Sequence, residues 1–214
     1  MAKRKVLMIG TKKEKWMSSR ESILNRIKEN KPSLLDLPII DKEVFVNVDV
    51  DQLAKFQKML EVVGCNLISV SSRDELMSNL IALFPIAKNN YSHVIEASGF
   101  NSIDLTEIQK PHELEDLDVL VLEGEVGVVE NGAIWIPETN IPVRVLPFIT
   151  KHLVLVLDES KIVATQHHAF EKIENSDFDY GIFISGPSKT ADIEQSLVIG
   201  AQGALSLTVF LVKN

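Results

Sequence analysis

The chain has little of several features that would mark a special class of protein. Its 214 residues include one cysteine, Cys65, which excludes an internal disulfide and a cysteine-ligated iron–sulfur cluster built by this chain alone. No apolar run reaches the length needed to span a membrane. The apolar segment after the basic residues 3–5 is too short for a secretory leader. We therefore expect a cytoplasmic protein without a membrane span.

An excess of positive charge is also missing. The chain has 22 Lys and Arg residues against 30 Asp and Glu residues, a formal net charge of −8, and neither sign forms long blocks. Because nucleic-acid surfaces need clustered positive charge, no nucleic-acid partner is expected. Hydrophobic residues make up 45% of the chain, which is enough for the packed core of one domain of ordinary size.

The first 42 residues predict a helix and a connector. Ser18 and Glu21 have the spacing of a capping box, in which each side chain accepts a hydrogen bond from the backbone N–H of the other residue. Apolar residues then recur at helical spacing until Pro32, and the stretch 33–42 has no period. We expect residues 1–42 to form this helix and an extended connector packed on the main body, and residues 43–214 to form a single domain.

Strands and helices alternate through that domain. Apolar runs that are not interrupted by polar residues are typical of strands buried on both faces, and helices between them favour a largely parallel sheet. The expected fold is therefore α/β. Strands are predicted at 44–48, 65–70, 92–97, 118–122, 127–129, 133–136, 152–157, 181–184 and 206–212, and helices at 51–63, 76–83 (after a second capping-box pattern at 72–75), 169–173 and 191–200.

Polar residues gather just after the predicted strand 181–184. Gly186 allows a backbone bend, Pro187 fixes its own φ, and Ser188 can cap the helix predicted to follow. A helix N-terminus carries partial positive charge, so this loop could bind an anion. The alternative is a well-capped helix without a ligand. Further polar side chains lie within the next two turns, at Thr190, Asp192 and Glu194.

The run 184–194, the segment Gly200–Gly203 and the closing strand 207–212 together resemble the C-terminal signature of the LUD family of lactate-utilisation proteins, in particular the protein C type. Residues 130–136, and His152 before its apolar strand, extend the resemblance. It implies a three-layer α/β/α fold similar to the NagB/RpiA/CoA-transferase superfamily and a role in oxidising L-lactate to pyruvate. In such a system other proteins carry the iron–sulfur clusters, so we expect no cofactor in this chain and iron–sulfur proteins among its partners.

Four residues depart from the pattern of the family that the chain resembles. Asn131 and Ala133 stand where threonines are usual, and Gln202 and Ala204 stand in a segment that usually contains histidine and proline. Two hydroxyl groups and an imidazole are therefore replaced, which changes what a pocket lined by these residues can bind.

We predict a ligand pocket between the loop 185–190 and the turn 124–132, because open α/β sheets bind ligands in crevices at strand ends. The ligand would be a small carboxylate or a phosphate-bearing molecule, with iron–sulfur proteins of lactate oxidation as possible partners and no metal. The candidate ligand-binding residues are Asn131, Gly132, His152, Gly186, Pro187, Ser188, Thr190, Asp192 and Glu194.

A second hypothesis makes the chain an independent acyl-transferring enzyme. Glu130, Asn131 and Gly132 resemble the Glu-Asn-Gly motif of CoA-transferases, in which the glutamate attacks an acyl-thioester. Glu130 is the candidate catalytic residue of this hypothesis, and a simple turn between two strands is its alternative. Lys189 and Thr190 lack the preceding glycines of a phosphate-binding loop.

Overall fold

We analysed a computed structural model of the chain, which describes residues 18–36, 38–39, 41, 51–174, 179–193 and 196–213. The chain divides into two compact units, residues 1–40 and residues 41–214. The predicted strand 44–48 lies outside the described residues. In the described part of the chain, no helix is long and apolar enough to cross a membrane.

The described part of the first unit holds one helix, α1 (Ser19–Glu29). Ser18 caps it, and the predicted capping box is present: the Glu21 N–H donates to Ser18 Oγ at 3.2 Å, and the Ser18 N–H donates to Glu21 Oε2 at 2.9 Å. None of the residues of α1 is buried.

A five-stranded parallel sheet forms the centre of the second unit. Its strand order is β1-β11-β6-β3-β2, and each neighbouring pair is parallel. This confirms the α/β fold with a largely parallel sheet. The central strands are Asn66–Val70 (β1), Asn90–Ser92 (β2), Val119–Glu123 (β3), His152–Asp158 (β6) and Ser206–Val212 (β11).

The two faces of the central sheet bury different elements. On one face, valines of β6 (Val154, Val156) join a core cluster with residues of α3 (Leu76–Leu83) and of the 3-10 helix η3 (Ile95–Phe100). On the other face, alternate leucines of the same strand pack with α2 (Gln52–Val62) and β5 (Ile134–Pro137). Successive side chains of a strand point to opposite faces of the sheet, so the single apolar run of β6 contributes residues to both cores.

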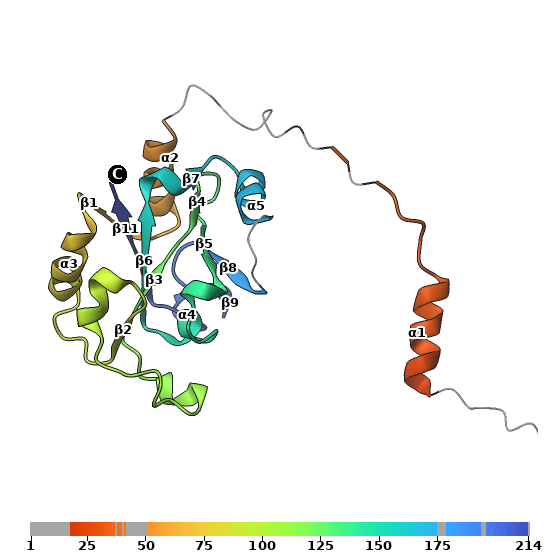
Figure 1. Cartoon of the computed structure of the whole chain (residues 1–214), viewed down its shortest axis with the longest axis horizontal. Coiled ribbons are helices and arrows are strands. Elements are labelled where there is room, and N and C mark those ends of the chain that lie inside the picture. The colour runs from red at the N-terminus through yellow and green to blue at the C-terminus, as the bar shows by residue number, and fades with distance from the viewer. Residues whose placement is uncertain are drawn as a thin grey trace, which may run out of the picture. The chain divides into compact units, whose positions relative to one another are not determined.

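A smaller four-stranded sheet, in the order β7-β4-β5-β8, covers the second face. Its other strands are Val126–Val128 (β4), Ile162–Val163 (β7) and Gly181–Ile184 (β8). Helix α5 (Gln166–Glu174) packs on the far face of this sheet, in a cluster with Trp135 of β5. Figure 1 shows α3 and α5 on opposite sides of the two sheets. Short helices complete the unit: η2 (Arg73–Glu75), η4 (Pro111–Leu114), η5 (Glu138–Asn140), α4 (Leu146–Ile149) and η6 (Glu159–Lys161).

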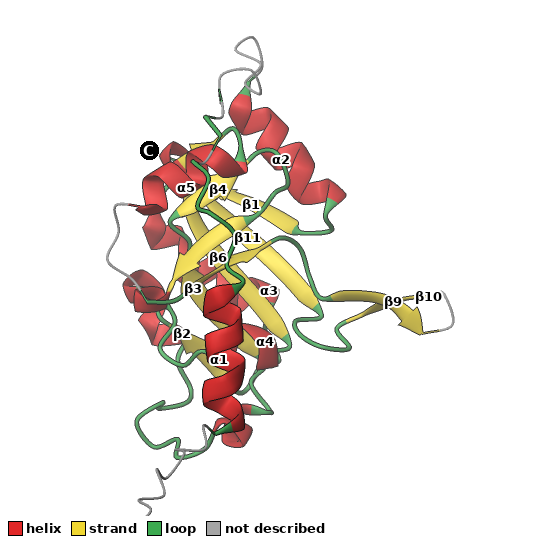
Figure 2. Ribbon diagram, turned by 90° about the vertical axis from the view of Figure 1, so that its right-hand side faces the viewer, coloured by secondary structure: helices red, strands yellow, loops and turns green. Residues whose placement is uncertain are grey.

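The predicted helix 191–200 is wrong, because this segment forms an antiparallel hairpin of β9 (Lys189–Ile193) and β10 (Ser196–Ile199). Thr190 pairs with Val198, and β-branched residues such as these favour extended backbone. Gly200, at φ +78, ends the second strand and donates its N–H to the Ser188 carbonyl oxygen at 2.9 Å. Ser188 therefore closes the base of a hairpin and caps no helix. Figure 2 shows the hairpin projecting from the strands of the central sheet.

Two other predicted elements differ from the structure. The strand expected at 92–97 ends at Ser92, and its second half forms η3. At 72–75 the second capping-box pattern does not form, since Ser72 makes no side-chain cap hydrogen bond. The helix predicted at 51–63 is confirmed as α2, and the Asp51 carboxylate accepts the N–H groups of Leu53 and Ala54.

Gly186 packs so closely on the end of α2 that only glycine fits there. It has φ +79, and a Cβ at this position would lie 2.5 Å from the Val63 carbonyl oxygen. We expect Gly186→Ala to lower the free energy of unfolding by at least about 2 kcal/mol, because backbone strain and a backbone clash add.

Denaturant unfolding measures this change, and Gly99→Ala is the matched control. A Cβ at Gly99 would meet only the Met77 side chain, at 3.4 Å, and we expect a change below about 1 kcal/mol. Equal stability of the two variants would contradict the close packing of Gly186 on α2.

Candidate functional site

The structure brings the predicted loop and the predicted turn together. Ser185, at the start of the loop that joins β8 to β9, donates its hydroxyl to the Asn131 carbonyl oxygen at 2.7 Å. Asn131 belongs to the turn between β4 and β5, and these two residues are 54 positions apart in the chain. The fold therefore places the turn beside the start of the loop.

The turn itself is held by its own side chains and by the first residue of α5. Asn131 Oδ1 accepts the Ala133 N–H at 3.0 Å, and Gly132 has φ +66. The Glu130 carboxylate accepts the N–H of Gln166 at 3.0 Å, which satisfies a free amide at the N-terminus of α5. Glu130 also lines a cavity of about 290 Å³ with Lys55. Glu130 thus accepts a hydrogen bond from the N-terminus of α5 and also lines this cavity.

A second cavity, of about 320 Å³, lies beside the loop 185–188. The Ser188 amide, which could receive an anion, is used within the protein, since its N–H donates to the Ala204 carbonyl oxygen at 3.0 Å. Because no helix begins here, the helix N-terminus that was expected to bind an anion does not exist. The cavity is lined by Ser185, Gly186, Ser188, Lys189, Gln202, Gly203 and Ala204, and by the apolar residues Pro147, Phe148, Leu153, Ile182, Phe183 and Ile184.

Lys189 supplies positive charge to this cavity. Its ammonium group donates to the Val63 carbonyl oxygen at 2.5 Å, at the C-terminal end of α2, where a cation is favoured by the helix dipole. No carboxylate lies among the lining residues, and Lys189 forms no salt bridge within the described ranges. Sequence analysis missed this lysine, because its position in the cavity depends on a contact between residues 126 positions apart.

The single cysteine lies behind the same loop. Burial raises the pKa of the Cys65 thiol to about 11, although a hydrogen bond from Gly186 and the charge of Lys189 act in the opposite direction. The thiol therefore stays protonated at neutral pH and belongs to the core.

The remaining predicted site residues do not line this cavity. Pro187 is buried in the loop, and Thr190 and Asp192 belong to strand β9 of the hairpin. Glu194 lies outside the described residues, as does the side chain of Asp192.

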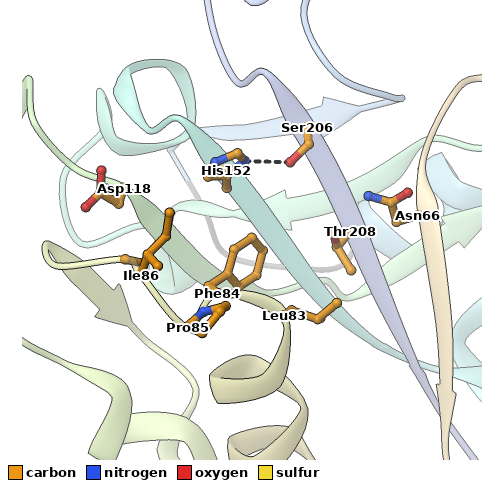
Figure 3. Close-up of a pocket in the computed structure, with 10 residues that line it drawn as sticks. Asn66, Leu83, Phe84, Pro85, Ile86, Asp118, His152, Ser206 and Thr208 are labelled. Atoms are coloured by element: carbon orange, nitrogen blue, oxygen red, sulfur yellow. Dashed lines mark hydrogen bonds between the residues drawn. The ribbon is translucent and has the colours of Figure 1, made fainter.

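His152 lies in a separate pocket of about 390 Å³, at the amino ends of the central strands and on the α3 face (Figure 3). Its Nδ1 is 2.8 Å from the Ser206 hydroxyl, and its ring lies 5.4 Å from the Phe84 ring. Asp118, just before β3, also lines the pocket and forms an ion pair with Lys151 at 2.8 Å. His152 and Lys189 therefore line different cavities.

Charged side chains meet at the opposite, carboxyl edge of the central sheet. Arg73 donates to both carboxylate oxygens of Glu123, at 2.9 and 2.6 Å, and to Asp158 at 3.2 Å. Lys161 lies 3.7 Å from both carboxylates. Burial would raise the pKa of the Glu123 carboxyl, but the hydrogen bonds and charges of Arg73 and Lys161 lower it below its ordinary value. We call these four residues the Arg73 cluster.

The positions of the two acidic residues of the Arg73 cluster could have been predicted from the sequence. Glu123 and Asp158 each end a buried strand, and the carboxyl ends of parallel strands share one edge of a sheet. Arg73 comes from the segment after β1 and has no comparable signal. Among the described residues, no group of three or more His, Cys, Asp or Glu side chains has the geometry to hold a metal ion.

We expect Arg73→Met to lower the free energy of unfolding by about 1 to 3 kcal/mol at pH 7, because two partly buried carboxylates then keep only the more distant Lys161 as a cation. The pKa of Glu123 lies below its unfolded value, so the stability that it contributes is present at neutral pH and is lost as the pH falls through the folded pKa. The variant lacks this contribution. Its deficit should therefore shrink as the pH is lowered from 7 towards 3.

Urea unfolding across this pH range measures the deficit. Arg144→Met is the control, because Arg144 pairs with Glu138 at an exposed site and should cost less than about 1 kcal/mol. A deficit that stays constant with pH would show that the Arg73 cluster does not lower the pKa of Glu123.

Comparisons with known proteins agree with the architecture. The sequence profile of the LUD domain family matches residues 106–212. A protein named Lactate utilization protein C from Geobacillus sp. (strain WCH70) is 30% identical over 129 residues, which are 57% of this chain and 50% of the relative. Another of that name, from Shouchella clausii (strain KSM-K16), is 28% identical over 105 residues, 47% of this chain and 46% of the relative. The chain thus spans about half the length of these curated relatives.

A solved structure supports the fold. The crystal structure of a DUF162 family protein from Deinococcus radiodurans aligns with a TM-score of 0.57 and 17% sequence identity, over 82% of this chain and 99% of the other. At this identity the likeness shows the fold alone.

Proposed function

The chain belongs to the LUD domain family, and from this membership we propose that it is a component of lactate utilisation that binds a small carboxylate beside Lys189. The observation that carries the proposal is Lys189, which lines a cavity of about 320 Å³ whose lining residues include no carboxylate.

Lys189 has donors left for a ligand. An ammonium group carries three N–H donors, and the Val63 carbonyl oxygen accepts one of them. A bound carboxylate would receive a charge-assisted hydrogen bond, which is about twice as strong as a neutral one. The Ser188 hydroxyl and the Gln202 amide line the same cavity and can bind a second oxygen or the 2-hydroxyl group of lactate. The apolar part of the lining suits the short carbon chain of the ligand.

We further propose that the redox chemistry resides in partner proteins that carry iron–sulfur clusters. The chain has one cysteine, and that thiol is buried with a raised pKa, so it is a poor cluster ligand. In this role the chain would hold the carboxylate substrate or product, and a partner would accept the electrons.

The carboxylate site predicts a charge-dependent thermal shift. Lactate or pyruvate at one hundred times its Kd should stabilise the native protein by about 2.7 kcal/mol. We expect Lys189→Met to abolish the shift and Lys189→Arg to retain part of it, because arginine keeps the charge. Lys172→Met, on α5, is the matched surface control and should bind as the native protein does. Unchanged binding in the Lys189→Met variant would remove the proposal.

The partner role predicts an association that can be recovered. The full chain carrying an affinity tag, expressed in its native host growing on lactate, should bring down iron–sulfur proteins in stoichiometric amounts. Mass spectrometry with an iron assay identifies them, and the same cells grown without lactate are the control. A chain that is always purified alone, while its deletion leaves growth on lactate intact, would contradict the accessory role.

A further inference from the structure

The pocket around His152 differs from the Lys189 cavity in its chemistry, and the fold keeps the two apart. The His152 pocket lies on the α3 face of the central sheet, whereas the Lys189 cavity includes Leu153, whose side chain points to the opposite face. No residue lines both.

Polar and apolar side chains occupy separate walls of this pocket (Figure 3). The segment Leu83–Ala87, at the end of α3, supplies every apolar lining residue. The starts of the central strands supply the polar ones, of which Asp118 carries charge. The polar lining residues are Asn66, Asp118, His152, Ser206 and Thr208.

Thr208 places a hydroxyl donor on the polar wall. The residue is 2% exposed, and no hydrogen bond of its hydroxyl is found within the described part of the chain. Because Thr208 lines the pocket, a ligand there can pair it.

Neighbouring groups add further donors to this wall. When the Ser206 hydroxyl donates to His152 Nδ1, Nε2 of the ring carries the hydrogen and becomes a donor. The Asn66 amide also has no described hydrogen-bond partner and can donate. Hydroxyl, imidazole and amide donors together suit a carbonyl oxygen on the ligand.

The charge in the pocket selects against anions. A hydrogen bond from Lys151 lowers the pKa of the Asp118 carboxyl to about 2, so this group stays ionised at neutral pH. Lys151 balances that charge from outside the lining, since its ammonium group is 2.8 Å from Asp118 Oδ1. A ligand carboxylate would therefore meet an aspartate whose charge is already balanced and would find no lysine or arginine among the lining residues.

We propose that this pocket binds a neutral, flat ring that carries a carbonyl or carboxamide group. The ring would lie against Phe84 and Ile86, and its carbonyl oxygen would accept from the Thr208 hydroxyl. The volume of about 390 Å³ leaves room for a bicyclic ring, which is too large to be filled by lactate.

The matched ligands quinoline-3-carboxamide and quinoline-3-carboxylate test the proposal. They share one ring, and the first is neutral whereas the second carries a negative charge. Calorimetry on the full chain at pH 7.5 should give a Kd at least about tenfold lower for the carboxamide, because the carboxylate loses hydration and finds no lysine or arginine among the lining residues. We expect Thr208→Val to weaken carboxamide binding about threefold to tenfold, since it removes one neutral donor of the same shape. Ile86→Ala, at a side chain that is 89% exposed, should weaken it without disturbing the fold.

Two variants serve as controls. Thr139→Val lies at an exposed position in η5 and should bind as the native chain does. Lys189→Met should also leave carboxamide binding unchanged, so that failure of the carboxylate site and failure of this pocket give different results. No binding of the carboxamide, equal binding of the carboxylate, or unchanged binding in both Thr208→Val and Ile86→Ala would overturn the proposal.

Discussion

The pairing of β6 with its two parallel neighbours is the constraint on which the rest of the structure depends. All five residues Leu153–Leu157 are at most 1% exposed, and the strand holds fixed registers with β3 and β11. A slip of one residue would exchange the valine and leucine faces and expose both cores. Because the strands are parallel, their first residues meet at one edge of the sheet and their last residues meet at the other.

Each candidate site follows from that register. At the amino edge, pairing of His152 with Ser206 aligns the polar wall of one pocket, while the opposite face of the same strands borders the Lys189 cavity. At the carboxyl edge, Glu123 and Asp158 come close enough to share Arg73. Charge then separates the roles: the cavity lined by Lys189 and by no carboxylate suits an anion, and the pocket lined by Asp118 and by no lysine or arginine suits a neutral ligand.

The sequence predicted those parts of the fold that depend on local pattern. Apolar runs gave the strands 118–122, 152–157 and 206–212 to within one residue at each end, the capping box gave the start of α1, and apolar periodicity gave α2. The helix expected at 191–200 failed because Gly200 acts at the base of a hairpin, where the same positive φ that ends a helix ends a strand. Whether this segment forms a helix or a hairpin depends on pairing between strands, and the spacing of apolar residues along the chain does not show that pairing.

The candidate site was less predictable than the fold. The predicted loop and turn meet through the hydrogen bond between Ser185 and Asn131, but the cavity beside the loop is lined by no residue of the turn. Lys189 and Arg73 were missed, because their partners lie 126 and 50 positions away and only the tertiary fold brings them together. His152 was grouped with the loop, but a strand presents alternate residues to opposite faces, and the histidine faces the other way.

The central claim is that the Lys189 cavity receives a small carboxylate. Titration of the ¹⁵N-labelled protein with pyruvate, followed by backbone amide shifts, tests this claim most directly. The account predicts saturable shifts at Ser188, Lys189 and Gly203, with Asn66 and Thr208 unmoved. Shifts confined to the His152 pocket, or none at the loop residues, would contradict it.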